Sequence, residues 1–458
     1  MRPFIGRHLE LEKLNSLSQK ATASLVVIRG RRRIGKSRLI EEYAKDKKTF
    51  KFIGLPPTEN PKDQKDEFAW QLENQIKKPV IKKEDWNDLF LELSKHTKTG
   101  RVVVIFDEIS WMGDDLFLGK LKTAWDEWFS KNPRLTFILC GSVSSWIDEN
   151  ILSSTGFVGR ISLVLTLREL SLRESSVFLG NMSVYEKFKI LSVTGGIPRY
   201  LEEVDPGKSA DKNIMDLCYN PSGLLYYEFE QIFSDLFSPK NKTYRMLLES
   251  IVDGSLSPQE IFERLDLNKA GYFSDCLSDL EVAGFIERDY TWHLRSGRRS
   301  KLSHYRLIDN YARFYLKYIF PYKDQIKKGG LPSINWEAIM GLQFENLVLN
   351  NRNLLIERLG IKEIIYENPY FQKASDRRIG CQIDYLVQTR FNILYLFEVK
   401  FSRRPIGVEI IESIEQKIKA LALPMSIKPI LVHVNGVTED LEDRRYFANI
   451  ISFGEFFA

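Results

Sequence analysis

The chain has 458 residues, of which 43% are hydrophobic and 28% charged, and Lys and Arg outnumber Asp and Glu by 66 to 61. This composition excludes a disordered or collagen-like chain, and the length suggests about three domains. Four scattered cysteines without a Cys-x-x-Cys pair argue against a zinc ribbon or a disulfide framework. The charged N-terminus and the short apolar runs predict a cytoplasmic protein without a membrane segment.

Residues 1–167 show alternating apolar runs and amphipathic segments, which predict an α/β layer fold. The apolar runs at 25–29, 102–106, 136–140 and 162–167 are continuous, as in strands buried on both faces of a parallel sheet. The helical stretch over 168–240 is predicted to form a lid on this core.

A phosphate-binding loop follows the first predicted strand. The segment from Gly30 to Ser37 matches G-x-x-x-x-G-K-[ST] and opens a predicted helix, so backbone N–H groups and the helix N-terminus can hold phosphate. Lys36 is expected on the β- and γ-phosphates and Ser37 on Mg²⁺. The predicted nucleotide-binding residues of the loop are Gly30, Arg31, Arg32, Arg33, Ile34, Gly35, Lys36 and Ser37.

Two further strands end in polar residues that suit nucleotide hydrolysis. Asp107 and Glu108 follow the strand at 102–106, about seventy residues after the loop. Asp107 is expected to bind Mg²⁺ together with Ser37, and Glu108 to polarise the attacking water. Ser142 ends the next strand and is a candidate sensor of the γ-phosphate; a plain turn serine is the alternative.

With these motifs the first 240 residues resemble the AAA+-related archaeal-type ATPases, near the signal-transducing STAND ATPases. The resembling segments are 4–7, 29–37, 105–108, 140–142, 159–160 and 195–200. The resemblance implies ATP rather than GTP, and hydrolysis linked to homo-oligomerisation. It makes Arg160 a candidate arginine finger or sensor, for its own site or a neighbour's, with an ordinary surface arginine as the alternative.

Residues 241–328 are predicted to form a winged helix, from three short helices and two strands at 289–294 and 303–308. The turn between the two predicted strands and the second strand contain five basic residues, Arg295, Arg298, Arg299, Lys301 and Arg306. Such a strip predicts salt-dependent contact with DNA phosphates. The predicted recognition helix at 269–281 is not basic, so a structural or autoinhibitory module remains the alternative.

Residues 333–458 are predicted to form a separate α/β domain with a carboxylate–lysine site. Asp384 lies on one predicted strand, and Glu398 and Lys400 lie two apart on the next, so a hairpin can bring them together. Two carboxylates can hold Mg²⁺ against a scissile phosphate, and the ammonium can position water. Glu345, on the preceding predicted helix, is a candidate further ligand.

This last third resembles the PD-(D/E)XK nuclease superfamily, in the restriction-endonuclease-like version called DUF234 that is fused to such ATPases. Asp384, Glu398 and Lys400 match its motif, and Glu345 matches the helix glutamate less closely. The leading hypothesis is therefore an ATP-hydrolysing protein that acts on DNA and cleaves phosphodiesters with its C-terminal domain. The alternatives are a STAND-like nucleotide switch, or a DNA-binding regulator, with a silent nuclease-like domain.

Overall fold

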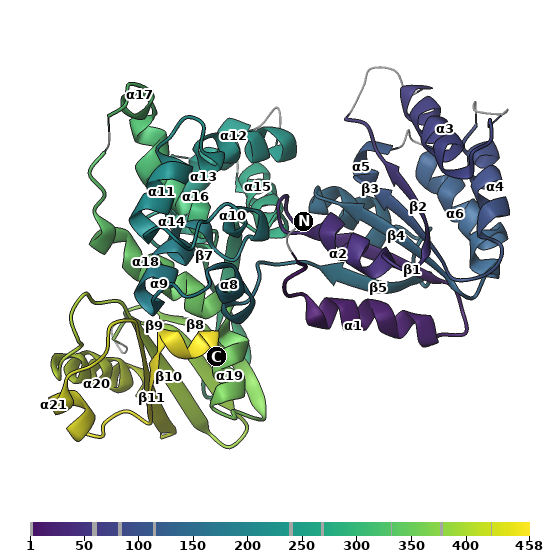
Figure 1. The fold of residues 1–458 in the computed structure, drawn as a ribbon. Helices are drawn as coiled ribbons and strands as arrows, with labels where there is room; N and C mark the ends of the chain where they lie inside the picture. The colour runs from purple at the N-terminus through teal and green to yellow at the C-terminus, as the bar shows by residue number, and fades with distance from the viewer. Residues whose placement is uncertain are drawn as a thin grey trace. The chain divides into compact units, whose positions relative to one another are not determined.

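The computed structural model describes residues 3–56, 62–80, 85–112, 116–237, 241–266, 270–330, 332–375, 379–422 and 424–458. The chain divides into two compact units, Met1–Arg168 and Glu169–Ala458 (Figure 1). Within the described ranges, every helix is too short or too polar to cross a membrane.

A five-stranded parallel sheet forms the centre of the first unit, in the order β2-β3-β4-β1-β5. Its strands are β1 (Ser24–Arg29), β2 (Lys48–Ile53), β3 (Val102–Asp107), β4 (Leu135–Gly141) and β5 (Ile161–Thr166). The four strands predicted from apolar runs are present, and β2 was not predicted. Burial on both faces was wrong for β5, which lies at the edge of the sheet with only Leu165 buried. Because the strands are parallel, β1, β3 and β4 end at the same edge of the sheet.

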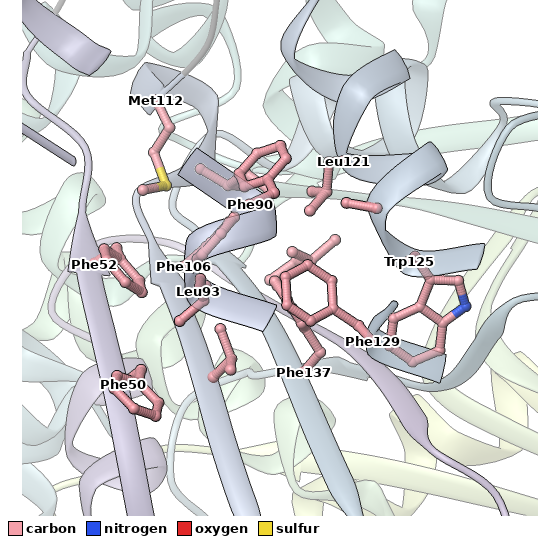
Figure 2. Packing of buried hydrophobic residues seen from close by; sticks show 14 of the residues in the cluster. Phe50, Phe52, Phe90, Leu93, Phe106, Met112, Leu121, Trp125, Phe129 and Phe137 are labelled. Carbon is pink, nitrogen blue, oxygen red and sulfur yellow. The ribbon is translucent and has the colours of Figure 1, made fainter. Parts of the chain in front are cut away.

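Helices cover both faces of this sheet (Figure 1). They are α1 (His8–Ser16), α2 (Lys36–Ala44), α3 (Lys62–Ile76), α4 (Trp86–Thr97), α5 (Ile109–Met112), α6 (Phe117–Glu127) and α7 (Ser144–Ile147). On one face, rings from the strands and helices pack into an aromatic core (Figure 2). Phe106 lies at its centre, with its ring centroid 4.8 Å from that of Phe137. Burial of each such side chain stabilises the fold by roughly 1.5–3 kcal/mol.

The open edge of β2 is closed by glutamine side chains from α3. The Gln75 carboxamide accepts from Lys51 N at 2.8 Å and donates to Lys51 O at 3.0 Å. Gln71 makes the same pair of bonds to Ile53, at 2.8 and 3.0 Å. Each carboxamide therefore replaces one residue of a missing neighbouring strand, which protects an otherwise exposed sheet edge.

A five-stranded mixed sheet forms the C-terminal part of the second unit, in the order β12-β11-β10-β9-β8. Its strands are β8 (Ile364–Gln372), β9 (Cys381–Thr389), β10 (Ile393–Lys400), β11 (Ser426–His433) and β12 (Asn449–Ser452). β8, β9 and β10 run antiparallel, whereas β10, β11 and β12 run parallel. The predicted β9–β10 hairpin is present, and the strands β8, β11 and β12 were not predicted.

The remainder of the second unit is helical apart from one hairpin, β6 (Ile286–His293) and β7 (Arg298–Leu307). The helices are α8 (Leu172–Phe178), α9 (Val184–Thr194), α10 (Pro198–Leu201), α11 (Ala210–Cys218), α12 (Leu224–Phe237), α13 (Asn241–Ser250), α14 (Pro258–Arg264), α15 (Ala270–Val282), α16 (Asn310–Phe314), α17 (Lys323–Lys327), α18 (Trp336–Asn350), α19 (Arg352–Arg358), α20 (Glu409–Leu421) and α21 (Glu439–Asp443). The three helices and two strands predicted between 243 and 308 are present as α13, α14, α15, β6 and β7.

The β6–β7 hairpin packs against the C-terminal sheet. Trp292 is buried in the core of that sheet, where its ring stacks on Tyr366 with centroids 5.4 Å apart. Its indole N–H donates to Gln388 Oε1 at 2.6 Å, and the Gln388 amide donates to Leu294 O at 2.9 Å. One side of the hairpin is therefore used for packing within the unit.

Arg306 does not belong to an exposed basic strip, which corrects the sequence interpretation of this residue. It is 4% exposed, and its guanidinium contacts Asp289, Glu287 and Asn346, each at 2.9 Å. Burial alone would lower the pKa of Arg306, but the two carboxylates raise it overall. The ion pairs lie within the hairpin, and the hydrogen bond to Asn346 of α18 joins the hairpin to the helix that precedes the C-terminal sheet.

We expect Arg306→Leu to lower the free energy of unfolding of the second unit by about 3–5 kcal/mol, because Asp289 would be left as a buried charge without its counter-ion. Chemical denaturation of the full-length protein measures this loss. Arg298→Leu is the matched control at an exposed position of the same strand, and should change stability by less than about 0.5 kcal/mol. Equal effects of the two substitutions would contradict a structural role for Arg306.

Candidate functional site

The backbone of the predicted phosphate-binding loop depends on its two glycines. Gly30 has φ +147°, and a Cβ there would lie 2.5 Å from Leu167 O. Gly35 has φ 89° and caps the N-terminus of α2. L-residues with a side chain rarely adopt these conformations, so the sequence pattern reflects a steric requirement of the turn. The loop connects β1 directly to α2, whose N-terminus carries the positive end of the helix dipole.

The Lys36 ammonium is buried inside the loop. Its Nζ donates to Gly30 O at 2.8 Å and to Arg31 O at 3.1 Å, and the residue is 7% exposed. Burial lowers the pKa of Lys36, while the nearby Asp107 and Glu108 act in the opposite direction. Two carbonyl oxygens of the loop thus hold the ammonium in place.

Ser37 and Asp107 meet at the carboxyl edge of the sheet. Ser37 Oγ lies 3.1 Å from Asp107 Oδ2, although the residues are seventy positions apart in the sequence. A hydroxyl and a carboxylate oxygen at this separation are hard ligands that suit Mg²⁺, which retains several waters and takes phosphate oxygens for the remainder of its shell. These two residues therefore fit a magnesium ion shared with a bound nucleotide.

Glu108 is held away from Asp107 by the next strand. The residue has φ 51°, in the left-handed region, and its Oε2 accepts from Ser142 N at 3.2 Å and from Ser142 Oγ at 3.0 Å. Ser142 follows β4, so the predicted sensor and the predicted catalytic carboxylate contact each other. A carboxylate with two donors on one oxygen is restrained in both position and orientation.

Arg160 contacts a carboxylate on α6. Its Nε lies 2.7 Å from Asp126 Oδ1 and its Nη2 2.9 Å from Asp126 Oδ2, which is a bidentate pair. Lys122 also reaches Asp126, at 3.1 Å. The hydrogen bond from Arg160 lowers the pKa of Asp126 to about 2. The structure therefore places Arg160 in a partly exposed surface pair, and a finger role would require it to leave Asp126.

Arg7 supports the loop, and the sequence analysis assigned it no site role. Its Nη2 donates to Ile34 O at 3.0 Å and to Arg168 O at 2.5 Å. The residue has φ 61° and is 5% exposed. A single guanidinium therefore ties the phosphate-binding loop to the segment that follows β5. Its place in the short 4–7 motif was the signal in the sequence.

The C-terminal site brings two predicted carboxylates together with a lysine that was not predicted. The β9–β10 ladder ends at Tyr385 and Phe397, and beyond it Asp384 Oδ2 accepts from Val399 N at 2.8 Å. Glu398 Oε2 contacts Lys417 Nζ of α20 at 2.5 Å, and both side chains are less than 20% exposed. The predicted Lys400 is exposed at the end of β10.

The charges of this site are strongly coupled. Burial raises the pKa of Asp384, and Glu398 and Glu345 raise it further, whereas Lys417 lowers it. Burial alone would lower the pKa of Lys417, but Asp384 and Glu398 raise it overall. The two carboxylates therefore repel each other, and the Lys417 ammonium is the cation that offsets the repulsion.

Glu345, on α18, also interacts with a second set of charges, from β7 and α16. Burial raises its pKa, and the guanidinium groups of Arg306 and Arg313 oppose that effect. Among the residues that the structure describes, no group of three or more His, Cys, Asp or Glu side chains is arranged to hold a metal ion. The expected set of Glu345, Asp384 and Glu398 thus does not fit a metal site in this arrangement.

Lys417 could have been found from the helical period. On α20 the buried side chains of Ile410, Ile414 and Leu421 form an apolar stripe, and Lys417 occupies the position in that stripe between Ile414 and Leu421. A lysine at a core-facing position predicts a buried carboxylate partner, because an unpaired buried ammonium is costly. The sequence does not say which carboxylate is the partner.

Residues 4–204 match the model of a family described as an ATPase domain predominantly from Archaea. This segment contains every residue predicted for the nucleotide site. The chain is also 28% identical over 333 residues to an uncharacterised protein of Methanocaldococcus jannaschii, a match that covers 71% of each chain. The N-terminal segment is thus similar to an archaeal-type ATPase domain.

Two solved structures resemble part of this chain. A Walker-type ATPase of Pyrococcus abyssi matches with a TM-score of 0.49 and 17% identity, over 69% of this chain and 99% of that one. An ORC2 protein of Aeropyrum pernix matches with a TM-score of 0.42 and 15% identity, over 72% and 96%.

Proposed function

We propose that this protein binds ATP with Mg²⁺ and hydrolyses it in its N-terminal domain. The contact between Ser37 and Asp107, beside the buried Lys36 ammonium, carries this proposal, and the match to an archaeal-type ATPase domain supports it. We further propose the division into an ATPase core at 1–167, a helical lid at 168–240, a winged helix at 241–328 and a nuclease-like domain at 333–458.

In this proposal Lys36, the Ser37–Asp107 pair and Glu108 have different roles. Lys36 exchanges its bonds to Gly30 O and Arg31 O for phosphate oxygens, so that its charge stays compensated. Mg²⁺ held by Ser37 and Asp107 would neutralise charge that grows on the phosphates. Glu108 accepts a hydrogen bond from the attacking water, which requires its carboxylate to leave the two donors of Ser142.

Oligomerisation belongs to the same proposal. Arg160 is a surface arginine with a fixed fork geometry, which suits the γ-phosphate of a neighbouring copy. It contacts Asp126 in the isolated chain, so an arriving phosphate would compete with that carboxylate. Binding of a neighbour and release of the Arg160–Asp126 pair would then be coupled.

We expect Lys36→Ala to weaken ATP binding at least tenfold and to abolish turnover, because the phosphate charge loses its ammonium partner. Glu108→Gln should retain binding and lower the hydrolysis rate by about 10²-fold or more, as for the loss of a positioned general base. Nucleotide titration and phosphate release measure the two effects. Lys45→Ala, an exposed position after α2, is the control, and undiminished hydrolysis in Lys36→Ala would overturn the assignment.

We also propose that the tip of the β6–β7 hairpin contacts DNA. Arg295, Arg298, Arg299 and Lys301 are exposed there, whereas the apolar side of the hairpin is packed on the C-terminal sheet. Four exposed cations on one hairpin can neutralise several phosphates. The packing of Trp292 equally supports a structural role for the hairpin, so the cations are the part to test.

Replacing all four cations by Ala should weaken DNA binding and flatten its salt dependence. The slope of log affinity against log salt concentration should fall by roughly 3–4, at about 0.9 per lost phosphate contact. Fluorescence anisotropy with labelled duplex DNA at several salt concentrations measures the slope. Lys327→Ala/Lys328→Ala, at exposed positions of the same unit, is the control. An unchanged slope in the hairpin variant would favour the structural role.

For the C-terminal domain we propose cleavage of phosphodiesters at Asp384 and Glu398. Support comes from the two carboxylates that the β9–β10 hairpin brings together beside a lysine. The second candidate is a nucleotide switch or a DNA-binding regulator whose nuclease-like domain is silent. It is favoured by the Lys417 contact to Glu398 and by the lack, within the described ranges, of a three-ligand metal cluster.

Incubation of the protein with single-stranded, linear duplex and plasmid DNA distinguishes these two candidates. Under the first, DNA is cut in Mg²⁺ or Mn²⁺, and Asp384→Ala or Glu398→Ala/Lys400→Ala, purified in parallel, loses the cleavage. A dependence of this cleavage on added ATP would show that the N-terminal ATPase domain and the C-terminal domain are coupled. Cleavage that persists in both variants marks a contaminating nuclease, and no cleavage under any condition favours the switch.

A further inference from the structure

The cation that neutralises the C-terminal carboxylates is supplied by the chain itself. Lys417 Nζ lies 2.5 Å from Glu398 Oε2, with side-chain exposures of 19% and 9%. The contact joins α20 to β10, so it is set by the packing of a helix on the sheet and not by neighbouring residues in the sequence. The Coulomb attraction between two charges this well shielded from water is stronger than at the surface, and removal of one partner leaves the other as a buried charge without a counter-ion.

The packing of α20 places the Lys417 side chain on the side of the helix that faces the sheet. Ile410 and Ile414 precede Lys417 on the buried face of α20, and Leu421 follows it. Leu394 and Leu396 lie on the face of β10 that packs against these side chains, and Glu398 continues the same face two residues further on. Lys417 therefore points at Glu398 because its helical stripe and the strand face coincide.

Lys400, the lysine of the predicted motif, is placed differently from Lys417. It follows Glu398 on the same strand face but is exposed, and in the register it pairs with His433 of β11. The motif lysine and the lysine that contacts the carboxylate are thus different residues, from different elements. The distinction can be tested because each lysine can be removed separately.

A metal ion and the Lys417 ammonium compete for one oxygen. Mg²⁺ or Mn²⁺ bound to the same Glu398 oxygen at roughly 2.0–2.2 Å would lie a few ångströms from the Lys417 ammonium, and the two cations would repel each other in this poorly hydrated site. Of the carboxylates nearby, Glu345 is buried, which raises its pKa, and the charges of Arg306 and Arg313 oppose that effect. No third ligand is therefore arranged to compensate within the described part of the chain.

We propose that Lys417 is the resident cation of the Asp384–Glu398 pair, and that a divalent metal ion enters this site only by displacing the Lys417 ammonium from Glu398. The site is then closed to metal while Lys417 keeps its contact with Glu398. Metal entry requires the Lys417 side chain to withdraw, which links occupancy of the site to the conformation of that side chain. The identity of the site as a phosphodiester-cleaving centre rests on the proposed function, but the competition itself does not.

Mn²⁺ binding to the full-length protein tests the proposal, with calorimetric titration and the Mn²⁺ paramagnetic resonance signal as readouts. Lys417→Met should bind Mn²⁺ at least tenfold more tightly than the natural sequence, and Lys400→Met should bind it with unchanged affinity. Asp384→Asn/Lys417→Met should lose the gain, which locates the ion at this pair. Mn²⁺ should also raise the melting temperature of Lys417→Met more than that of the natural protein.

Lys417→Gln keeps a hydrogen-bond donor beside Glu398 and serves if the methionine variant does not fold. Unchanged Mn²⁺ affinity in Lys417→Gln and Lys417→Met, or an equal gain in Lys400→Met, would overturn the proposal. If Lys417→Met binds Mn²⁺ more tightly but neither the natural protein nor any variant cleaves DNA, the competition between metal and ammonium is supported and the nuclease assignment is overturned. If Lys417→Met abolishes DNA cleavage while its Mn²⁺ affinity is unchanged, the nuclease assignment is supported and the competition between metal and ammonium is overturned.

Discussion

Charge buried away from water must be matched by opposite charge or by hydrogen-bonding dipoles, and this constraint organises both units of the protein. The Lys36 ammonium is matched by carbonyl oxygens of its own loop. Arg306 is matched by Asp289 and Glu287, and Lys417 by Glu398. The first pairing lies within one loop, the second joins the two strands of one hairpin, and the third joins a helix to a strand.

In the N-terminal unit the constraint produces a site poised for a negatively charged ligand. The strands β1, β3 and β4 end at the same edge of the parallel sheet, and the polar residues that follow them form hydrogen bonds with one another there. Ser37 contacts Asp107, and Ser142 holds Glu108. A nucleotide with its magnesium ion could exchange these contacts for its own at little cost, since the donors and acceptors are already in place.

In the second unit the same constraint makes α18 a junction. Asn346 receives a bond from Arg306, and Gln343 accepts from the buried Arg313 at 2.9 Å. Burial lowers the pKa of Arg313 to about 10, and the Glu345 carboxylate opposes that effect. Glu345 thus interacts both with Arg306 of the hairpin and with Asp384, so its pKa depends on the first charge and it raises the pKa of the second.

The sequence alone was sufficient wherever the signal is local. The phosphate-binding loop requires glycine at positions with φ 89° and 147°, and the strands β1, β3, β4 and β5 are continuous apolar runs. The edge strand β2 escaped prediction because polar residues interrupt its apolar ones, and polar residues interrupt or flank the apolar ones of β8, β11 and β12; the edge strand β5 was predictable because its sequence is mostly apolar, although only Leu165 in it is buried. The pairing of Asp384 with Glu398 followed from their places in one hairpin.

Tertiary packing decided which charges meet. The sequence placed Arg306 in a basic strip and Lys400 beside Glu398, because adjacency in the chain was the only guide to proximity. The fold buries Arg306 against Asp289, directs Arg160 to Asp126 and brings Lys417 to Glu398 from a helix nineteen positions away. The sequence determined the chemical groups and their local backbone; the choice of partner for each buried charge depends on long-range packing, which no local pattern encodes.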